Sequence, residues 1–140
     1  MNGHNDHSLI PDSHRDLIDK PTFWHVATIG PDGAPHSSPV WVDHDDNGNL
    51  LFSSVRGRQK YKNLRDDPRI SLSATDPVNP YRYLEIRGTV VRFDDDPGGL
   101  FLDGMAKKYL DTDIYPAHDP ETDAQRVIVV IRPHHTTTMG

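Results

Sequence analysis

Cysteine is missing from the 140 residues of this chain. A disulfide framework, a thiolate metal site and a cysteine nucleophile are therefore excluded. The chain also has no hydrophobic run close to the roughly 20 residues that a membrane-spanning helix needs. Its first residues, 1–11, are polar and lack the apolar segment of a secretion signal. We therefore expect a cytoplasmic protein with no membrane partner.

Positive charge is also in short supply, with 15 lysines and arginines against 21 acidic residues and a formal net charge of −6. Most nucleic-acid-binding proteins rely on an excess of positive charge, so neither DNA nor RNA is an expected partner. The 9 histidines do not form HExxH or a pair four residues apart on an expected helix, so no metal site is expected. The GxSxG, GxGxxG and GxxxxGK[ST] motifs do not occur either.

A chain of this length forms one domain, and we assign 1–140 to a single domain with a flexible segment at 1–10. Only 34% of the residues are hydrophobic. Such a small, polar chain buries a limited core, and dimerisation would help to complete it.

Six segments have the composition or the period-two alternation of β-strands. They are 23–29, 36–42, 50–54, 70–75, 83–90 and 127–131. Turn-forming clusters at 30–33 and 43–48 join the first three, and a β-meander is the simplest arrangement for them. Short helices are expected at 12–19, at 59–66 and between 95 and 109, and a polar loop at 111–125. The pattern predicts a mainly-β protein, a closed or nearly closed antiparallel barrel.

One segment reverses the overall charge. Between Arg56 and Arg69 there are six basic and two acidic residues, a local charge of +4. The segment follows the strand that ends in Ser53 and Ser54, and it opens a helix. That order can surround one anion with hydroxyls, backbone N–H groups and cations, so we interpret it as a phosphate site. The alternative is a solvated, charged surface.

Several blocks of the sequence resemble the pyridoxamine 5'-phosphate oxidase-like FMN-binding split-barrel family. The blocks are Ala27–Gly33 with Pro35, Ser38–Val42, Arg56–Lys60, Asn63–Arg69, Asn79–Gly88, Lys107–Leu110, Tyr115–Pro116 and Ile131–Pro133. Together they are most similar to the branch of deazaflavin (coenzyme F420)-dependent oxidoreductases. They cover nearly the whole chain from about Ser8 onward.

The resemblance implies a six-stranded split β-barrel that forms a homodimer, with each cofactor cleft built from both chains. Its motif positions imply that Arg58 and Lys60 hold the cofactor phosphate, with Ser53 and Ser54 beside it. The same comparison places Ser37, Ser38, Pro39, Val40 and Trp41 along the edge of the isoalloxazine ring. It brings the partner's Tyr83 toward the ring, and it lets Arg56 and Lys62 meet a polyglutamate tail. No catalytic side chain is assigned.

Two departures from the family pattern bear on function. The arginine- and histidine-containing segment with which true pyridoxamine-phosphate oxidases hold their substrate is not recognisable after Arg126, so vitamin B6 oxidation is not expected. Arg58 stands where the family has serine, which favours the more anionic deazaflavin over FMN. We therefore expect hydride transfer between a deazaflavin and a small conjugated organic substrate. An FMN-dependent oxidase or reductase, or a non-catalytic flavin- or tetrapyrrole-binding protein, are the alternatives.

Overall fold

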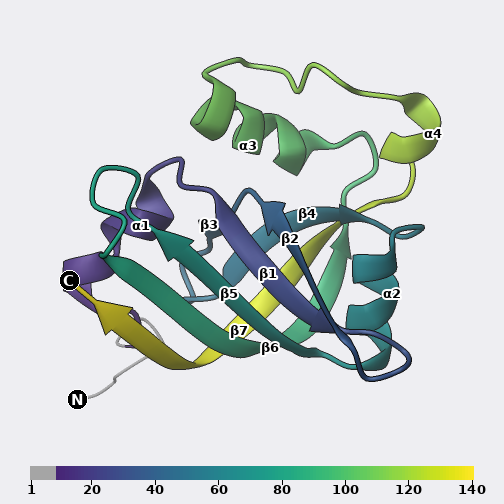
Figure 1. The fold of residues 1–140 in the computed structure, drawn as a ribbon. Coiled ribbons are helices and arrows are strands. Elements are labelled where there is room, and N and C mark those ends of the chain that lie inside the picture. The colour runs from purple at the N-terminus through teal and green to yellow at the C-terminus, as the bar shows by residue number, and fades with distance from the viewer. Residues whose placement is uncertain (1–8) are drawn as a thin grey trace.

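The computed structural model of the protein describes residues 9–140, and its centre is one seven-stranded antiparallel sheet curled into a split barrel (Figure 1). The strands are β1 (Trp24–Ile29), β2 (Pro35–Val40), β3 (Asp43–His44), β4 (Leu50–Val55), β5 (Arg69–Thr75), β6 (Tyr83–Asp95) and β7 (Arg126–Met139). Their order in the sheet is β2-β1-β5-β6-β7-β4-β3. The mainly-β, antiparallel prediction is confirmed.

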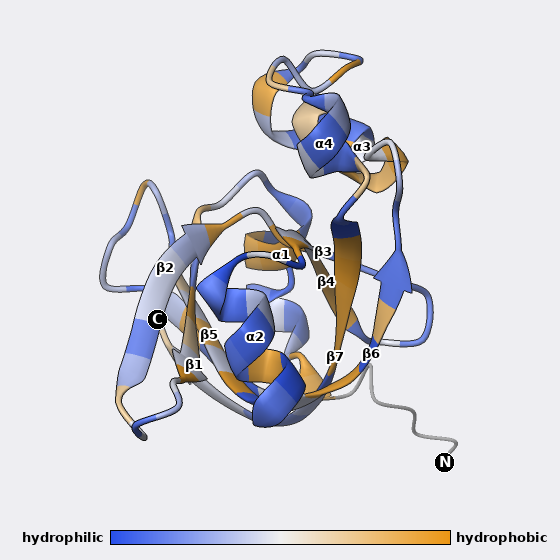
Figure 2. Ribbon diagram, turned by 90° about the vertical axis from the view of Figure 1, so that its right-hand side faces the viewer, coloured by the Kyte–Doolittle hydropathy of each residue, from blue (hydrophilic) through white to orange (hydrophobic). Residues whose placement is uncertain are grey.

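Short helices surround the barrel. They are the 3-10 helix η2 (Asp12–His14) and the α-helices α1 (Asp16–Asp19), α2 (Gln59–Asp66), α3 (Leu100–Leu110) and α4 (Pro120–Asp123). Helices α1 and α2 lie at opposite ends of the barrel, and α3 and α4 form a separate layer beyond β4 (Figures 1 and 2). None of the described helices is long and apolar enough to cross a membrane.

The prediction of six strands is wrong by one, because β3 was interpreted as part of a turn. The Asp45 carboxylate accepts the backbone N–H groups of Asn47 and Asn49, at 2.9 and 3.0 Å. This local capping tightens the turn, so the two residues before it fall opposite Leu50 and Leu51 and pair with them.

The predicted β-meander is also wrong, because β4 pairs with β7 instead of β2. Apolar cross-strand pairs favour this register, among them Leu50 with Ile131 and Phe52 with Val129. Strand β2 contributes mostly exposed, polar side chains and contains Pro39, which lacks a backbone donor. It therefore forms an edge of the sheet.

Strands β6 and β7 are longer than predicted, and they pair along almost their whole length. Register shifts at Arg87/Gly88 and Val90/Arg92 interrupt the alternation of polar and apolar residues that marks a strand in the sequence. At the first shift the two strands lie so close that a Cβ on Gly88 would be 2.5 Å from the carbonyl oxygen of Arg132. Glycine is the residue that permits this approach.

The core fills the barrel with side chains from nearly every strand. Trp24, Phe52, Leu72 and Ile86 are fully buried in one hydrophobic cluster, and the hydropathy colouring shows apolar residues concentrated on the strands (Figure 2). Ile10 joins this cluster with 3% of its surface exposed. The structure therefore includes the last part of the segment expected to be flexible, whereas 1–8 lie outside the described residues.

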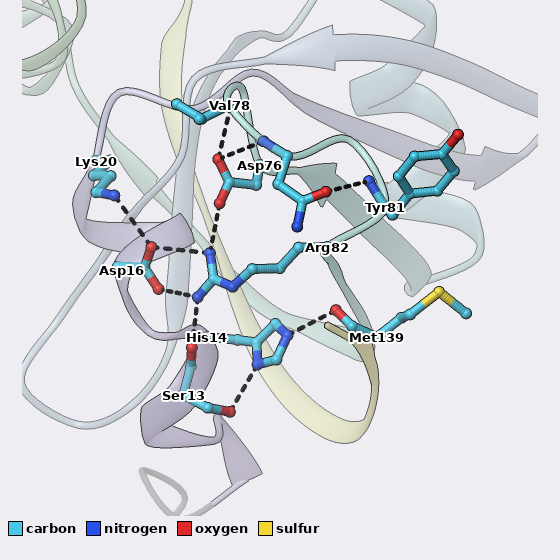
Figure 3. Close-up of polar contacts among 10 residues, drawn as sticks. Ser13, His14, Asp16, Lys20, Asp76, Val78, Tyr81, Arg82 and Met139 are labelled. Carbon is cyan, nitrogen blue, oxygen red and sulfur yellow. Dashed lines mark hydrogen bonds and ion pairs between the residues drawn. The ribbon is translucent and has the colours of Figure 1, made fainter.

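A polar cluster centred on Arg82 attaches the N-terminal helices to the barrel (Figure 3). Arg82 Nη1 donates hydrogen bonds to Asp16 Oδ2, at 3.1 Å, and to Asp76 Oδ2, at 3.0 Å. The buried His14 ring lies 3.0 Å from the carbonyl oxygen of Met139. The Arg82 guanidinium lowers the pKa of Asp16 to about 2. This cluster, built from residues far apart in the sequence, fixes the barrel end away from α2.

Candidate functional site

A cavity of about 340 Å³ lies where the ends of β2 and β4, the start of α2, and α3 meet. Its lining residues are Phe23, Pro39, Val40, Trp41, Ser53, Ser54, Val55, Arg58, Lys60, Leu102, Met105, Tyr115 and Arg126. Three of them are cations and none is acidic. Arg126 is paired with Asp123 at 2.7 Å, so Arg58 and Lys60 give the cavity a positive charge that favours an anion, in a chain with a net charge of −6.

The serine hydroxyls of β4 supply the polar part of the cavity wall. The side-chain oxygens of Ser53 and Ser54 are buried, and neither has a hydrogen-bond partner within the described part of the chain. Leaving a buried hydroxyl unpaired costs about 1–3 kcal/mol. Both residues line the cavity, but consecutive side chains of a strand point to opposite faces, so one ligand can satisfy at most one of the two hydroxyls. One serine hydroxyl together with the cations Arg58 and Lys60 of the same lining makes a donor set that fits a phosphate group.

The start of α2 supplies the cations. Arg58 is the N-cap residue of α2, and no side chain caps the first N–H groups of the helix. Burial, and then the neighbouring charge of Arg58, lower the pKa of Lys60. Within residues 9–140, no carboxylate forms an ion pair with either cation. A bound anion would offset both the burial of the Lys60 charge and its repulsion by Arg58.

Most of the predicted site residues gather at this cavity, namely Pro39, Val40, Trp41, Ser53, Ser54, Arg58 and Lys60. Four others are not among its lining residues, and each has another environment. Ser37 and Ser38 lie farther along the edge strand β2, opposite β1. Arg56 forms an ion pair with Asp95. Tyr83 lines a second hollow over β1, β5 and β6, and Phe23 contributes to both hollows.

The sequence interpretation missed Arg126 and Tyr115 as lining residues. Arg126 is 6% exposed, its Nε donates to Asp123 Oδ1 at 2.7 Å, and its guanidinium lies 5.5 Å from the centre of the Tyr115 ring. In the sequence, Arg126 stands out only as a single arginine between a polar loop and an apolar strand, which does not by itself indicate a ligand site.

Aromatic contacts hold α3 over the cavity. The Trp41 ring stacks on Tyr109 with centroids 5.2 Å apart. The Tyr109 hydroxyl donates to the carbonyl oxygen of Thr22 at 2.6 Å and accepts the N–H of Val42 at 3.1 Å. These contacts anchor the C-terminal end of α3 on the barrel, so Leu102 and Met105 of this helix form an apolar wall of the cavity.

The split barrel and its cavity assign the chain to the class of small barrels with a ligand cavity at the rim. Residues 10–140 match the family described as Pyridoxamine 5'-phosphate oxidase, and the chain belongs to this family. A solved structure named F420 Reductase is 37% identical, with a TM-score of 0.82, over 91% of this chain and 98% of that one. This similarity confirms the F420 branch of the family.

Two further solved structures are more distant. A conserved hypothetical protein from Mycobacterium tuberculosis is 27% identical, with a TM-score of 0.71, over 92% of this chain and 84% of that one. General Stress Protein 26 from Bacillus anthracis, at 17% identity and a TM-score of 0.65 over 89% of each chain, shares the fold. A search of curated proteins gives no match. At the level of the family, the protein is a flavin- or deazaflavin-related oxidoreductase.

Proposed function

We propose that this protein is an oxidoreductase that binds the deazaflavin coenzyme F420 in the cationic cavity and exchanges a hydride with a small conjugated organic substrate. The observation that carries the proposal is the pair of cavity-lining cations, Arg58 and Lys60, which have no carboxylate partner among the described residues, with burial lowering the pKa of Lys60. The 37% identity to an F420 reductase favours the deazaflavin over FMN.

In this proposal the cofactor phosphate lies at the start of α2. Arg58 and Lys60 hold it by charge-assisted hydrogen bonds, and Ser53 and Ser54 lie beside it. The proposed ring edge follows Ser37, Ser38, Pro39, Val40 and Trp41. Arg56 and Lys62 are proposed for the polyglutamate tail, and Arg56 would then have to leave its ion pair with Asp95.

A bound deazaflavin ring supplies the hydride chemistry. The protein orients the ring and keeps water away from it, and the apolar wall of Leu102 and Met105 under α3 suits both tasks. No side chain is assigned as proton donor.

We also propose that the protein works as a homodimer. The cavity of a single chain, about 340 Å³, is near the lower limit of the roughly 300–1,000 Å³ that ligand pockets occupy. It is too small to enclose a whole deazaflavin cofactor. A second copy would extend it, with the partner's Tyr83 approaching the ring.

The test is a titration of the purified protein with coenzyme F420 and, separately, with FMN, followed by quenching of tryptophan fluorescence. We expect a Kd for F420 below about 100 μM, which corresponds to more than about 5 kcal/mol. The double variant Arg58→Ala/Lys60→Ala should lose most of this affinity. Arg69→Ala is the matched control, because Arg69 belongs to the same basic segment but is paired with Asp67 at 2.7 Å.

The titrations with F420 and FMN can overturn the choice of cofactor or the enzyme proposal itself. Tighter binding of FMN than of F420 would replace the deazaflavin by FMN. Failure to bind either cofactor would overturn the enzyme proposal. The dimer is tested separately by sedimentation, where a stable monomer that binds cofactor with full affinity would contradict a shared cleft.

A further inference from the structure

A histidine bridges two carboxylates behind the cavity. His118 Nε2 lies 2.6 Å from Asp103 Oδ1 of α3, and His118 Nδ1 lies 2.9 Å from Asp123 Oδ2 of α4. The other oxygen of Asp123 accepts the Nε hydrogen of Arg126 at 2.7 Å. Four side chains therefore form a continuous polar chain from α3 to the cavity wall.

Arg126 ends this chain with part of its guanidinium still available. Its Nε is bound by Asp123 and the Tyr115 ring lies alongside it. In the described part of the chain, the terminal guanidinium nitrogens make no hydrogen bond. The residue nevertheless lines the cavity while being only 6% exposed. A buried cation with unused donors beside a cavity indicates a ligand contact.

The β4–β7 pairing places Arg126 close to the proposed phosphate site. Arg126 lies directly opposite Val55, and Val55 is two residues from Ser53 on the same face of β4. Diagonal neighbours across an antiparallel pair are about 7–8 Å apart, which is within the reach of an arginine side chain. The position of Arg126 therefore permits it to contact the ligand that Ser53 contacts.

We propose that Arg126 binds an oxygen acceptor of the cofactor directly, and that His118 is the positioning residue that keeps Arg126 in place through Asp123. The inference rests on the proposed function, since the acceptor is an oxygen of the bound cofactor. That oxygen belongs either to the phosphate or to a carbonyl of the ring.

The proposal makes the protonation of His118 important. The hydrogen bond to Asp103, followed by that to Asp123, raises the pKa of His118. An imidazolium donates to both carboxylates, whereas a neutral imidazole has a single N–H and can donate to only one. Deprotonation therefore breaks the bridge between α3 and Asp123, which leaves Arg126 less firmly oriented.

Other groups also lie around the His118 bridge, the first being the Tyr115 ring, which meets the His118 ring edge-on with centroids 5.5 Å apart. Asp103 also accepts the backbone N–H of Tyr115 at 2.8 Å, so the same carboxylate fixes the residue that packs against Arg126. The buried carboxylate of Asp96 faces the start of α3, where it accepts the N–H of Phe101. With His118 protonated, the charges of Asp103, Asp123, His118 and Arg126 sum to zero; without that proton the group carries −1. Cofactor affinity should therefore fall as the pH rises through the pKa of His118.

The experiment compares Kd values for F420 and FMN between about pH 6 and about pH 9 for the wild-type protein, Arg126→Lys and His118→Gln. We expect Arg126→Lys to weaken binding by about 10-fold or more, because lysine cannot keep the Asp123 contact and reach the ligand at once. His118→Gln should weaken binding at low pH and converge with the wild-type protein at high pH. Protonation of the cofactor itself changes the Kd of both proteins equally, so it cancels in the ratio of the His118→Gln Kd to the wild-type Kd.

The control is His44→Gln, since His44 also contacts a carboxylate, Asp19 Oδ1 at 3.1 Å, but does not line the cavity. Riboflavin, which lacks the phosphate, identifies the oxygen that Arg126 contacts. If Arg126→Lys loses affinity for FMN but not for riboflavin, the acceptor is the phosphate. If it loses affinity for both, the acceptor is a ring carbonyl. If His118→Gln does not fold, Asp103→Asn removes the same bridge.

Two results would overturn the inference while the proposed function stands. They are wild-type affinity in Arg126→Lys, and an unchanged pH profile in the variant that lacks the bridge. If the wild-type protein binds no cofactor at all, the proposed function fails and this inference fails with it.

Discussion

Lys60 is the residue for which the proposed function makes the sharpest prediction, because its charge should be unfavourable without ligand and favourable with it. Burial and the charge of Arg58 lower its pKa, so the folded protein without ligand disfavours the ammonium group. This penalty is complete at any pH below the lowered pKa, shrinks as the pH rises from there to the usual lysine pKa, and is absent above it. Lys60→Met retains an aliphatic chain over the Phe52 ring, which the ammonium group approaches to 5.8 Å.

The variant should therefore be more stable than the wild-type protein at neutral pH but bind FMN more weakly. Losing one hydrogen bond between charged groups costs about 1.5–3 kcal/mol, which corresponds to a Kd about 10- to 150-fold higher. Urea denaturation without ligand measures the first effect, and titration with FMN measures the second.

Lys62→Met is the matched control, because Lys62 is exposed on the same helix and FMN lacks the tail proposed to contact it. Calorimetry in two buffers adds an independent check: an anion that raises the pKa of Lys60 must cause proton uptake near that pKa. Lower stability of ligand-free Lys60→Met, or unchanged FMN affinity, would refute the reasoning.

Three further predictions concern the stability of the ligand-free protein. The pKa of Asp16 is lowered from 3.8 to about 2, so its ion pair with Arg82 stabilises the fold above pH 3.8 and loses this effect as the pH falls through about 2. The Asp16 side chain is 36% exposed, so Asp16→Asn should lower the free energy of unfolding in urea by only about 1 kcal/mol at neutral pH, and by nothing in strong acid. Gly88→Ala should destabilise by about 1–3 kcal/mol or more, since its Cβ would meet the Arg132 carbonyl oxygen at 2.5 Å, whereas Gly57→Ala meets no atom within 4 Å and should leave the melting temperature nearly unchanged. Ser54→Ala removes an unpartnered buried hydroxyl and should stabilise the ligand-free protein by about 1 kcal/mol. Equal melting temperatures with and without the substitution would argue that water already satisfies this group.

The part of the site that the sequence predicts is local in the chain. Ser53, Ser54, Arg58 and Lys60 fall within one strand end and the helix that follows it, so their order alone places hydroxyls and cations together. Arg126 reaches the same cavity only because β7 pairs with β4. The sequence alone does not reveal this pairing, so it gives no reason to connect Arg126 with the other residues of the site.

The fold shows the same division between local and long-range information. Turn residues and alternation predicted most strands, but β3 depends on a side-chain cap inside a turn. The full lengths of β6 and β7 depend on register shifts that change which face each residue occupies. His118 gave no signal because its two carboxylate partners lie 15 and 5 residues away and meet it only in the folded chain.

The cations that line the cavity, and Arg56 near it, differ in whether a carboxylate already pairs with them. Arg56 is held by Asp95, and Arg126 by Asp123, so a carboxylate already offsets each charge in the folded chain. Arg58 and Lys60 line the cavity without such a partner among the described residues, and the pKa of Lys60 reflects that cost. A ligand that neutralises these two charges offsets both the burial of the Lys60 charge and its repulsion by Arg58. Any ligand at a free concentration 100 times its Kd stabilises the fold by about 2.7 kcal/mol. The specific prediction is that the charges of Arg58 and Lys60 account for most of the affinity that sets this Kd.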